Sequence, residues 1–180
     1  MKRIRVEAFD ARKLARMTLV RERLNWYGDQ DHQRWTYKYR DRLGRVSYYK
    51  VWNRSYVRRD TMLPAIDAGF YDEQLTPALR AILVDGDGAM RGYVTAACHP
   101  RADRDHLDAR FYEQLKRKTE STGFFNYDVR PHHILRYRLR LSLIDLEGVY
   151  PLDQFPLLAR CHCHFGDADY ERFVARLFDG

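Results

Sequence analysis

Two aspartates, Asp128 and Asp145, lie seventeen residues apart, each beside a short apolar segment. Asp128 stands in a polar stretch just before Ile134-Leu135, and Asp145 directly follows the apolar run 141–144. This spacing suits a β-hairpin that brings both carboxylates to one end. Phosphoryl transfer needs such a pair, because one carboxylate orients the attacking hydroxyl while the other holds Mg²⁺ on the phosphates. The spacing therefore predicts a phosphoryl-transfer site.

The sequence around the two aspartates resembles the catalytic core of the protein-kinase-like fold. Residues 128–135 read Asp-Val-Arg-Pro-His-His-Ile-Leu, where the family has Asp-Leu-Lys-Pro-Glu-Asn-Ile-Leu. Residues 144–148, Ile-Asp-Leu-Glu-Gly, resemble a loosened form of the family's metal-binding Asp-Phe-Gly segment. The match fails at His133, where the family has an Asn for the second metal. It also fails at Asn126-Tyr127, where the family usually has His-Arg or His-Gly.

The resemblance implies a role for each matched residue. Asp128 would orient or deprotonate the acceptor hydroxyl, and Arg130 would stabilise the charge of the transferring phosphoryl group. Asp145 would hold the Mg²⁺ that bridges the phosphates of ATP. His133 is a poor ligand for Mg²⁺ and a better one for Mn²⁺ or Zn²⁺, so one metal suffices, another metal is used, or the site is inactive. Glu147 could add a carboxylate to the metal, but a solvated loop acid is the favoured interpretation.

The first half of the chain offers three further residues that the resemblance assigns to a nucleotide site. Lys50, in Tyr-Lys-Val-Trp, is similar to the phosphate-contacting Lys of the family's Val-Ala-Ile-Lys strand, although any amphipathic strand could carry an outward Lys. Asp60 would replace the helix Glu that pairs with this Lys; its alternative role is to favour the first turn of the helix electrostatically. Gly28 is the single glycine where the family has a glycine-rich loop, and Asp29 and Asp31 beside it oppose phosphate binding.

Residue patterns predict the elements that position these side chains. Period-two alternation and residues of high β-propensity predict strands at 17–20, 34–40, 46–52, 81–84 and 90–98. The first three of these would form an antiparallel meander, and the last two a hairpin. Helical spacing of apolar residues predicts helices at 58–68, 105–122 and 169–178. Pro64 is expected to interrupt the first helix and Gly69 to end it, while residues 151–156 are expected to form a loop.

The order of these elements predicts an α+β chain with the two-lobed protein-kinase-like fold. Residues 1–98 would form the N-lobe, mainly an antiparallel sheet with one short helix. Residues 99–180 would form a reduced helical C-lobe that carries the catalytic-type and metal-binding-type loops. Because little chain follows Asp145, a small molecule, a lipid-linked sugar or a partner-presented hydroxyl fits better as substrate than a free protein.

Composition sets outer limits on function. With 180 residues, the chain can form one domain or two small lobes. A net charge of +7 suggests an acidic partner, namely a nucleotide, a nucleic acid or an anionic surface, although an ordinary basic surface explains it equally well. No apolar run approaches the ~18 residues of a membrane span. No apolar segment follows the basic first residues, so a cytoplasmic setting is expected.

Two other functions stay open at this point. The chain could be a pseudokinase that binds or regulates, as His133, the missing glycines and the missing helix Glu suggest. It could also be a basic, non-catalytic module that binds an acidic protein or nucleic acid, although no nucleic-acid motif accompanies the aromatic and basic residues of 35–40 and 136–140. The run Cys161-His162-Cys163-His164 lacks the usual ligand spacing for zinc, and buried cysteines beside surface histidines are favoured.

Overall fold

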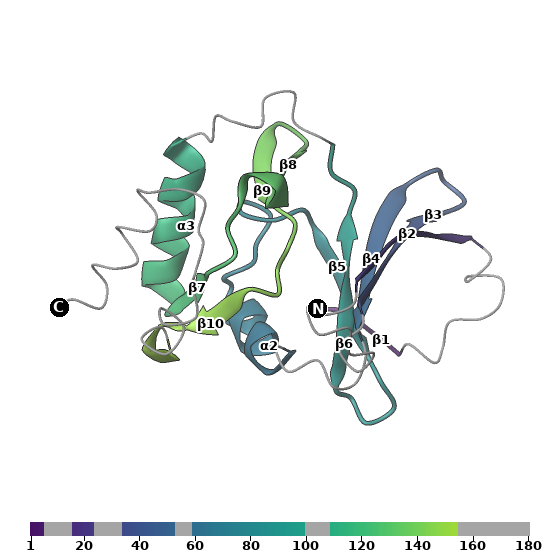
Figure 1. Cartoon of the computed structure of the whole chain (residues 1–180), viewed down its shortest axis with the longest axis horizontal. Helices are drawn as coiled ribbons and strands as arrows, with labels where there is room; N and C mark the ends of the chain where they lie inside the picture. Colours follow the sequence, from purple (N-terminus) through teal and green to yellow (C-terminus); the bar gives the residue numbers. More distant parts are fainter. Residues whose placement is uncertain (6–15, 24–33, 53–58, 100–108, 155–180) are drawn as a thin grey trace. The chain divides into compact units, whose positions relative to one another are not determined.

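The computed structural model of the chain describes residues 1–5, 16–23, 34–52, 59–99 and 109–154 (Figure 1). These residues form a mixed α+β structure with one six-stranded sheet, two two-stranded sheets and two α-helices, which confirms the expected α+β class. The chain divides into two compact units, residues 1–59 with 78–97 and residues 60–77 with 98–180. Segment 60–77, which the sequence assigns to the first lobe, thus groups with the second unit. The closing helix expected at 169–178 lies outside the described residues.

The first unit is built on the six-stranded sheet, with strand order β1-β5-β6-β4-β3-β2. Its strands are β1 (Arg3–Arg5), β2 (Met17–Arg23), β3 (Arg34–Arg40), β4 (Val46–Trp52), β5 (Leu79–Val84) and β6 (Met90–Ala96). Strands β2, β3 and β4 form the predicted antiparallel meander, and β5 and β6 form the predicted hairpin. Strand β1, which the sequence patterns did not predict, pairs with β5 in parallel. The hairpin therefore has strands on both sides.

Both faces of β4 carry buried side chains, because successive residues of a strand point to opposite sides of the sheet. The core cluster on one face consists of Tyr49, Ala81, Leu83 and Val94. On the other face Trp52 is fully buried, and its indole N–H donates a hydrogen bond to the Met90 carbonyl at 3.2 Å. The rings of Trp52 and Tyr93 meet edge to face, with centroids 5.9 Å apart. The aromatic residues that mark this strand in the sequence therefore anchor it from both sides.

Both α-helices of the described residues belong to the second unit: α2 (Arg59–Asp67) and α3 (Ala109–Thr122). Only the first residue of α2, Arg59, is grouped with the first unit. Strands β7 (Phe124–Asn126) and β10 (Val149–Pro151) pair antiparallel, and β8 (Ile134–Tyr137) and β9 (Arg140–Leu143) form a hairpin. Short 3₁₀ helices are found at η3 (Pro131–His133) and η4 (Leu152–Gln154). The prediction of a loop at 151–156 is therefore wrong at its start, because Pro151 is the last residue of β10 and η4 follows.

Glycines end both α-helices. Gly69 has φ +79°, and the amides of Gly69 and Phe70 donate to the carbonyls of Ile66 and Ala65, which is the Schellman pattern of a helix C-terminus. Gly123 follows α3 with φ +71° and leads directly into β7. The predicted interruption at Pro64 is wrong: Pro64 lies inside α2, and the helix continues past it to Asp67. Within the described part of the chain, neither α-helix is long and apolar enough to cross a membrane.

Candidate functional site

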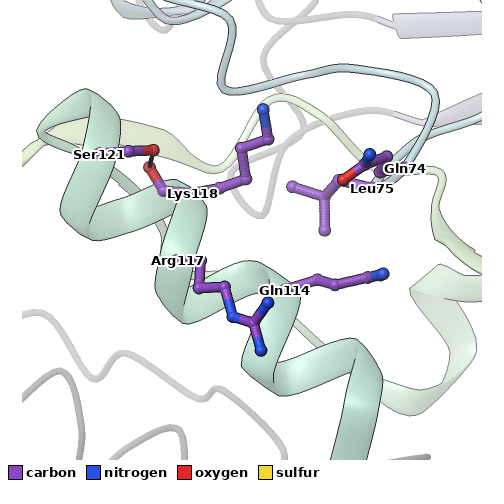
Figure 2. Close-up of a pocket in the computed structure, with 6 residues that line it drawn as sticks. All are labelled: Gln74, Leu75, Gln114, Arg117, Lys118 and Ser121. Atoms are coloured by element: carbon purple, nitrogen blue, oxygen red, sulfur yellow. Dashed lines mark hydrogen bonds between the residues drawn. The ribbon is translucent and has the colours of Figure 1, made fainter.

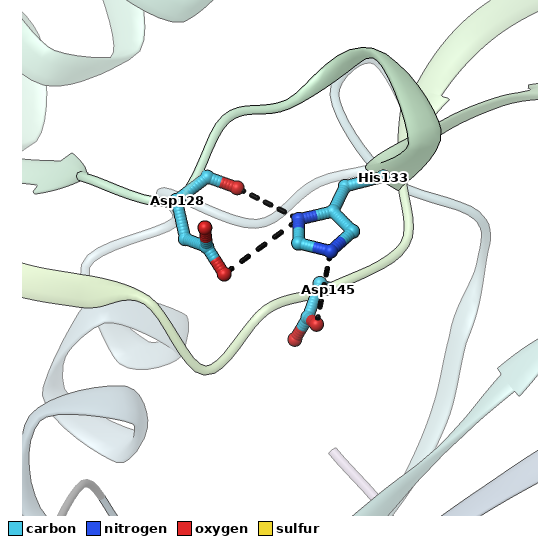
Figure 3. A group of neighbouring side chains, drawn as sticks. All are labelled: Asp128, His133 and Asp145. Carbon is cyan, nitrogen blue, oxygen red and sulfur yellow. Dashed lines mark hydrogen bonds and ion pairs between the residues drawn. The ribbon is translucent and has the colours of Figure 1, made fainter. Parts of the chain in front are cut away.

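Asp128, His133 and Asp145 lie together in the second unit (Figure 3). Asp128 lies in the loop between β7 and η3, His133 ends η3, and Asp145 follows β9. One ligand atom from each of the three residues lies within 4.8 Å of the other two. The hairpin β8–β9 returns the chain, and the Ile144 amide donates to the His133 carbonyl at 2.8 Å beside the site. Both carboxylates thus lie at one end of this hairpin.

His133 is the most deeply buried member of the cluster, with a side chain 8% exposed. Its Nδ1 lies 2.9 Å from the backbone carbonyl oxygen of Asp128 and 3.7 Å from a carboxylate oxygen of the same residue. Its Nε2 lies 3.6 Å from the Oδ2 atom of Asp145, as Figure 3 shows. The imidazole therefore stands between the two aspartates and presents one nitrogen to each.

Arg130 pairs with Asp128 within the same loop. The Nε atom of Arg130 lies 2.5 Å from Oδ1 of Asp128, and the two side chains are 43% and 20% exposed. The two paired atoms are buried, although both side chains reach solvent elsewhere. The pair holds a positive charge next to Asp128, the residue that, by the resemblance, orients the acceptor hydroxyl.

A buried amide, Asn126, joins the two loops that carry the aspartates. Its Oδ1 accepts a hydrogen bond from the Asp128 amide at 2.8 Å, and its Nδ2 lies 3.1 Å from the Tyr71 hydroxyl and 3.4 Å from the Asp145 carbonyl. The Tyr71 hydroxyl in turn donates to the Leu146 carbonyl at 2.7 Å. Sequence comparison with the family marked Asn126 only as a mismatch. An Asn two residues before Asp128 is nevertheless the spacing of an Asx-turn, which could have indicated this role.

Gly148 lets the two loops approach each other. A Cβ atom at this position would lie 2.8 Å from Cβ of Asp128 and 3.0 Å from Oδ1 of Asn126. The carbonyl of Gly148 also accepts a hydrogen bond from the Tyr127 amide at 2.8 Å. A glycine is therefore required at position 148 for close packing. The position of Gly148 after Asp145 in the sequence did not reveal this role.

Glu147 is only 3% exposed, so its interpretation as a solvated loop acid is wrong. Its neighbours Leu146 and Val149 are fully buried, which places the whole segment inside the second unit. The group of metal-ligating side chains found among the described residues does not include Glu147.

Lys50 belongs to the first unit and lies on the same face of β4 as Trp52. It is half-buried, and its Nζ lies 5.9 Å from the ring centroid of Tyr93, its partner across the β4–β6 pair. Asp60 lies in the first turn of α2. Gly28 lies outside the described residues. The proposed Lys50–Asp60 pair and the phosphate loop at Gly28 stay predictions.

A pocket of about 220 Å³ opens beside α3 (Figure 2). It is lined by Gln74, Leu75, Gln114, Arg117, Lys118 and Ser121. None of these residues belongs to the candidate site, and Lys118 is already paired with Asp72 at 2.6 Å.

The cysteines add no candidate nucleophile within the described residues. Burial raises the pKa of the Cys98 thiol to about 12, so this thiol stays protonated at neutral pH and is a poor nucleophile. The run Cys161 to His164 lies outside the described residues, and its zinc interpretation stays open.

Comparison with known proteins gives no further guide to this site: no protein-family model matches the sequence, and no curated protein is significantly similar to it.

Proposed function

We propose that this chain is a kinase-like phosphotransferase that moves the γ-phosphoryl group of ATP to a hydroxyl of a small molecule, a lipid-linked sugar or a partner-presented substrate. The observation that carries the proposal is the cluster of Asp128, His133 and Asp145, which have ligand atoms within 4.8 Å of one another. Kinase-type phosphoryl transfer uses one carboxylate for the acceptor hydroxyl and another for the metal, on neighbouring loops. The two loops of this cluster supply that combination.

The order of the elements also supports the proposal. The family's phosphate-contacting Lys lies on the third strand of the sheet, and its partner lies on the helix that follows. Here Lys50 lies on β4, the third strand of the β2–β3–β4 meander, and α2 with Asp60 comes next along the chain. The two-lobed arrangement of the kinase-like fold is part of this proposal.

In the proposed site, Asp145 and His133 would hold a divalent ion, Mg²⁺ or Mn²⁺, which would supply positive charge to neutralise the phosphates of ATP. Asp128 orients the acceptor hydroxyl or takes its proton. Arg130, 2.5 Å from Asp128, supplies positive charge near the phosphoryl group in transfer. The resemblance assigns the phosphate-contacting cation to Lys50.

The ion pair between Arg130 and Asp128 favours a second candidate, a pseudokinase that binds a nucleotide or a partner without transfer. The Arg130 guanidinium lies 2.5 Å from one oxygen of the Asp128 carboxylate and competes with an acceptor hydroxyl for that oxygen. His133 in place of the family's Asn points the same way. A pseudokinase would bind ATP without consuming it.

The test is ATP turnover by the purified full chain in Mn²⁺ and in Mg²⁺, with water as acceptor, since release of phosphate needs no knowledge of the substrate. Wild type should consume ATP, while Asp128→Asn and Asp145→Asn should each fall to the background rate. Asp153→Asn is the matched control, because Asp153 is an exposed aspartate of the same unit. Unchanged turnover in both site variants would refute the assigned roles. Binding of ATP without turnover by wild type would establish the pseudokinase.

A further inference from the structure

The hydrogen bond on Nδ1 determines which nitrogen of His133 can bind a metal. The Asp128 backbone carbonyl, 2.9 Å from Nδ1, can only accept a hydrogen bond. Nδ1 therefore carries the proton, and in the neutral ring Nε2 presents its lone pair. Protein histidines that bind metals commonly use this arrangement, in which a carbonyl or carboxylate on one nitrogen orients the other toward the ion. The backbone of Asp128 thus prepares Nε2 of His133 as a ligand.

The lone pair of Nε2 points toward Asp145. The Oδ2 atom of Asp145, at 3.6 Å, is the one polar contact of Nε2 among the described residues, and this separation is too long for a hydrogen bond. Two ligand atoms that each lie about 2.1 Å from one ion are roughly 3.0 Å apart at an octahedral angle and roughly 3.4 Å apart at a tetrahedral one. The observed gap is therefore close to the spacing of two atoms that share a cation.

We infer that His133 Nε2 and Asp145 Oδ2 form a mixed nitrogen–oxygen site for a divalent transition-metal ion, and that the chain uses Mn²⁺ in preference to Mg²⁺. The inference rests on the proposed function and specifies its metal. Mg²⁺ binds oxygen ligands almost exclusively, whereas transition metals accept imidazole nitrogen. Among them, Mn²⁺ also suits carboxylate and phosphate oxygens, which a nucleotide site requires. A His133 imidazolium held between two carboxylates without any metal is the competing interpretation.

The test measures Mn²⁺ binding to the nucleotide-free full chain by the loss of the free-ion signal in electron paramagnetic resonance, followed by competition with Mg²⁺. Wild type should bind Mn²⁺ at least about tenfold more tightly than Mg²⁺, because Mn²⁺ accepts an imidazole nitrogen whereas Mg²⁺ prefers oxygen ligands. His133→Asn should remove most of this preference, because an amide oxygen replaces the nitrogen. His99→Asn, at an exposed histidine of the same unit, should behave as wild type.

Three outcomes separate the inference from the function on which it rests. Equal affinity of wild type for Mn²⁺ and Mg²⁺, or an unchanged preference in His133→Asn, would overturn the manganese site. If a fluorescent ATP analogue nevertheless bound with Mg²⁺, the proposed nucleotide site would survive. Absence of both Mn²⁺ binding and nucleotide binding in wild type would refute the two together and favour the imidazolium interpretation. The comparison of the two metals on wild type needs no variant, so it stands even if His133→Asn folds poorly.

Discussion

A chain in which leucine replaces Asn126 is expected to lose about 3 kcal/mol of unfolding free energy, because each net hydrogen bond contributes about 1 kcal/mol and each orphaned buried partner costs more. Asn126 is fully buried and contacts three groups: the Asp128 amide, the Tyr71 hydroxyl and the Asp145 carbonyl. Leucine has a similar size and shape but can make none of these contacts. Urea denaturation followed by circular dichroism would measure the change.

The same substitution should also weaken divalent-ion binding, because Asn126 holds the backbone of both metal-site loops. Tyr71→Phe is the matched variant: it keeps the ring but removes the hydroxyl that donates to the Leu146 carbonyl at 2.7 Å. Combined in a double-mutant cycle, Asn126→Leu and Tyr71→Phe should show a coupling energy of about 0.5–3 kcal/mol, the range for residues in one network. Additive effects, or a stable Asn126→Leu chain that binds Mn²⁺ normally, would contradict the role of this amide.

Replacing Gly92 by alanine should destabilise the first unit by about 3 kcal/mol or more, which is the range for severe backbone and steric defects. Gly92 has φ +150°, a conformation that other residues rarely adopt, and an added Cβ would overlap the Lys50 carbonyl. The overlap occurs within the central β4–β6 pair, where Val51 faces Gly92. The strand that carries Lys50 could relieve it only by moving away from β6.

Gly86→Ala is the control for this prediction. Gly86 lies in the turn between β5 and β6, and an added Cβ there would meet no atom within 4 Å. The unfolding free energies of the two variants, measured by denaturant unfolding, should therefore differ by most of the loss expected for Gly92→Ala. Equal stability would show that β4 and β6 do not approach as closely at Gly92 as described.

The sequence predicted the longer strands of the first unit well because each is long enough to carry a local signal. Residues 34–40 alternate in side-chain character, residues 46–52 are rich in β-forming residues, and the two segments match β3 and β4 at both ends. Strands β1, β7 and β10 have three residues each and are too short to show a period. They exist because distant partners pair with them, such as Val149 with Asn126. Such pairing depends on tertiary contacts that local patterns do not contain.

In the candidate site, too, local features could be predicted from the sequence and long-range contacts could not. The sequence predicted that Asp128 and Asp145 lie close together, because their spacing suits a hairpin between them. Strands β8 and β9 form that hairpin. The Asx-turn spacing of Asn126 and Asp128 was a local signal, but the contact of Asn126 with Tyr71 spans a long sequence separation that local spacing does not predict. The burial of Glu147 was missed for the same reason, because a carboxylate in a loop normally faces solvent.

The most direct test of the kinase-like site is a thermal melt of the full chain with ATP and either Mn²⁺ or Mg²⁺, on wild type and Asp145→Asn in parallel. A ligand at about 100 times its dissociation constant stabilises the folded state by roughly 2.7 kcal/mol, a shift of roughly 5–10 °C for a chain of this size. We expect this shift in wild type and in Asp153→Asn, only with metal present, and its loss in Asp145→Asn. A wild-type melt that no combination of ATP and metal moves, or an equal shift in Asp145→Asn, would contradict the site.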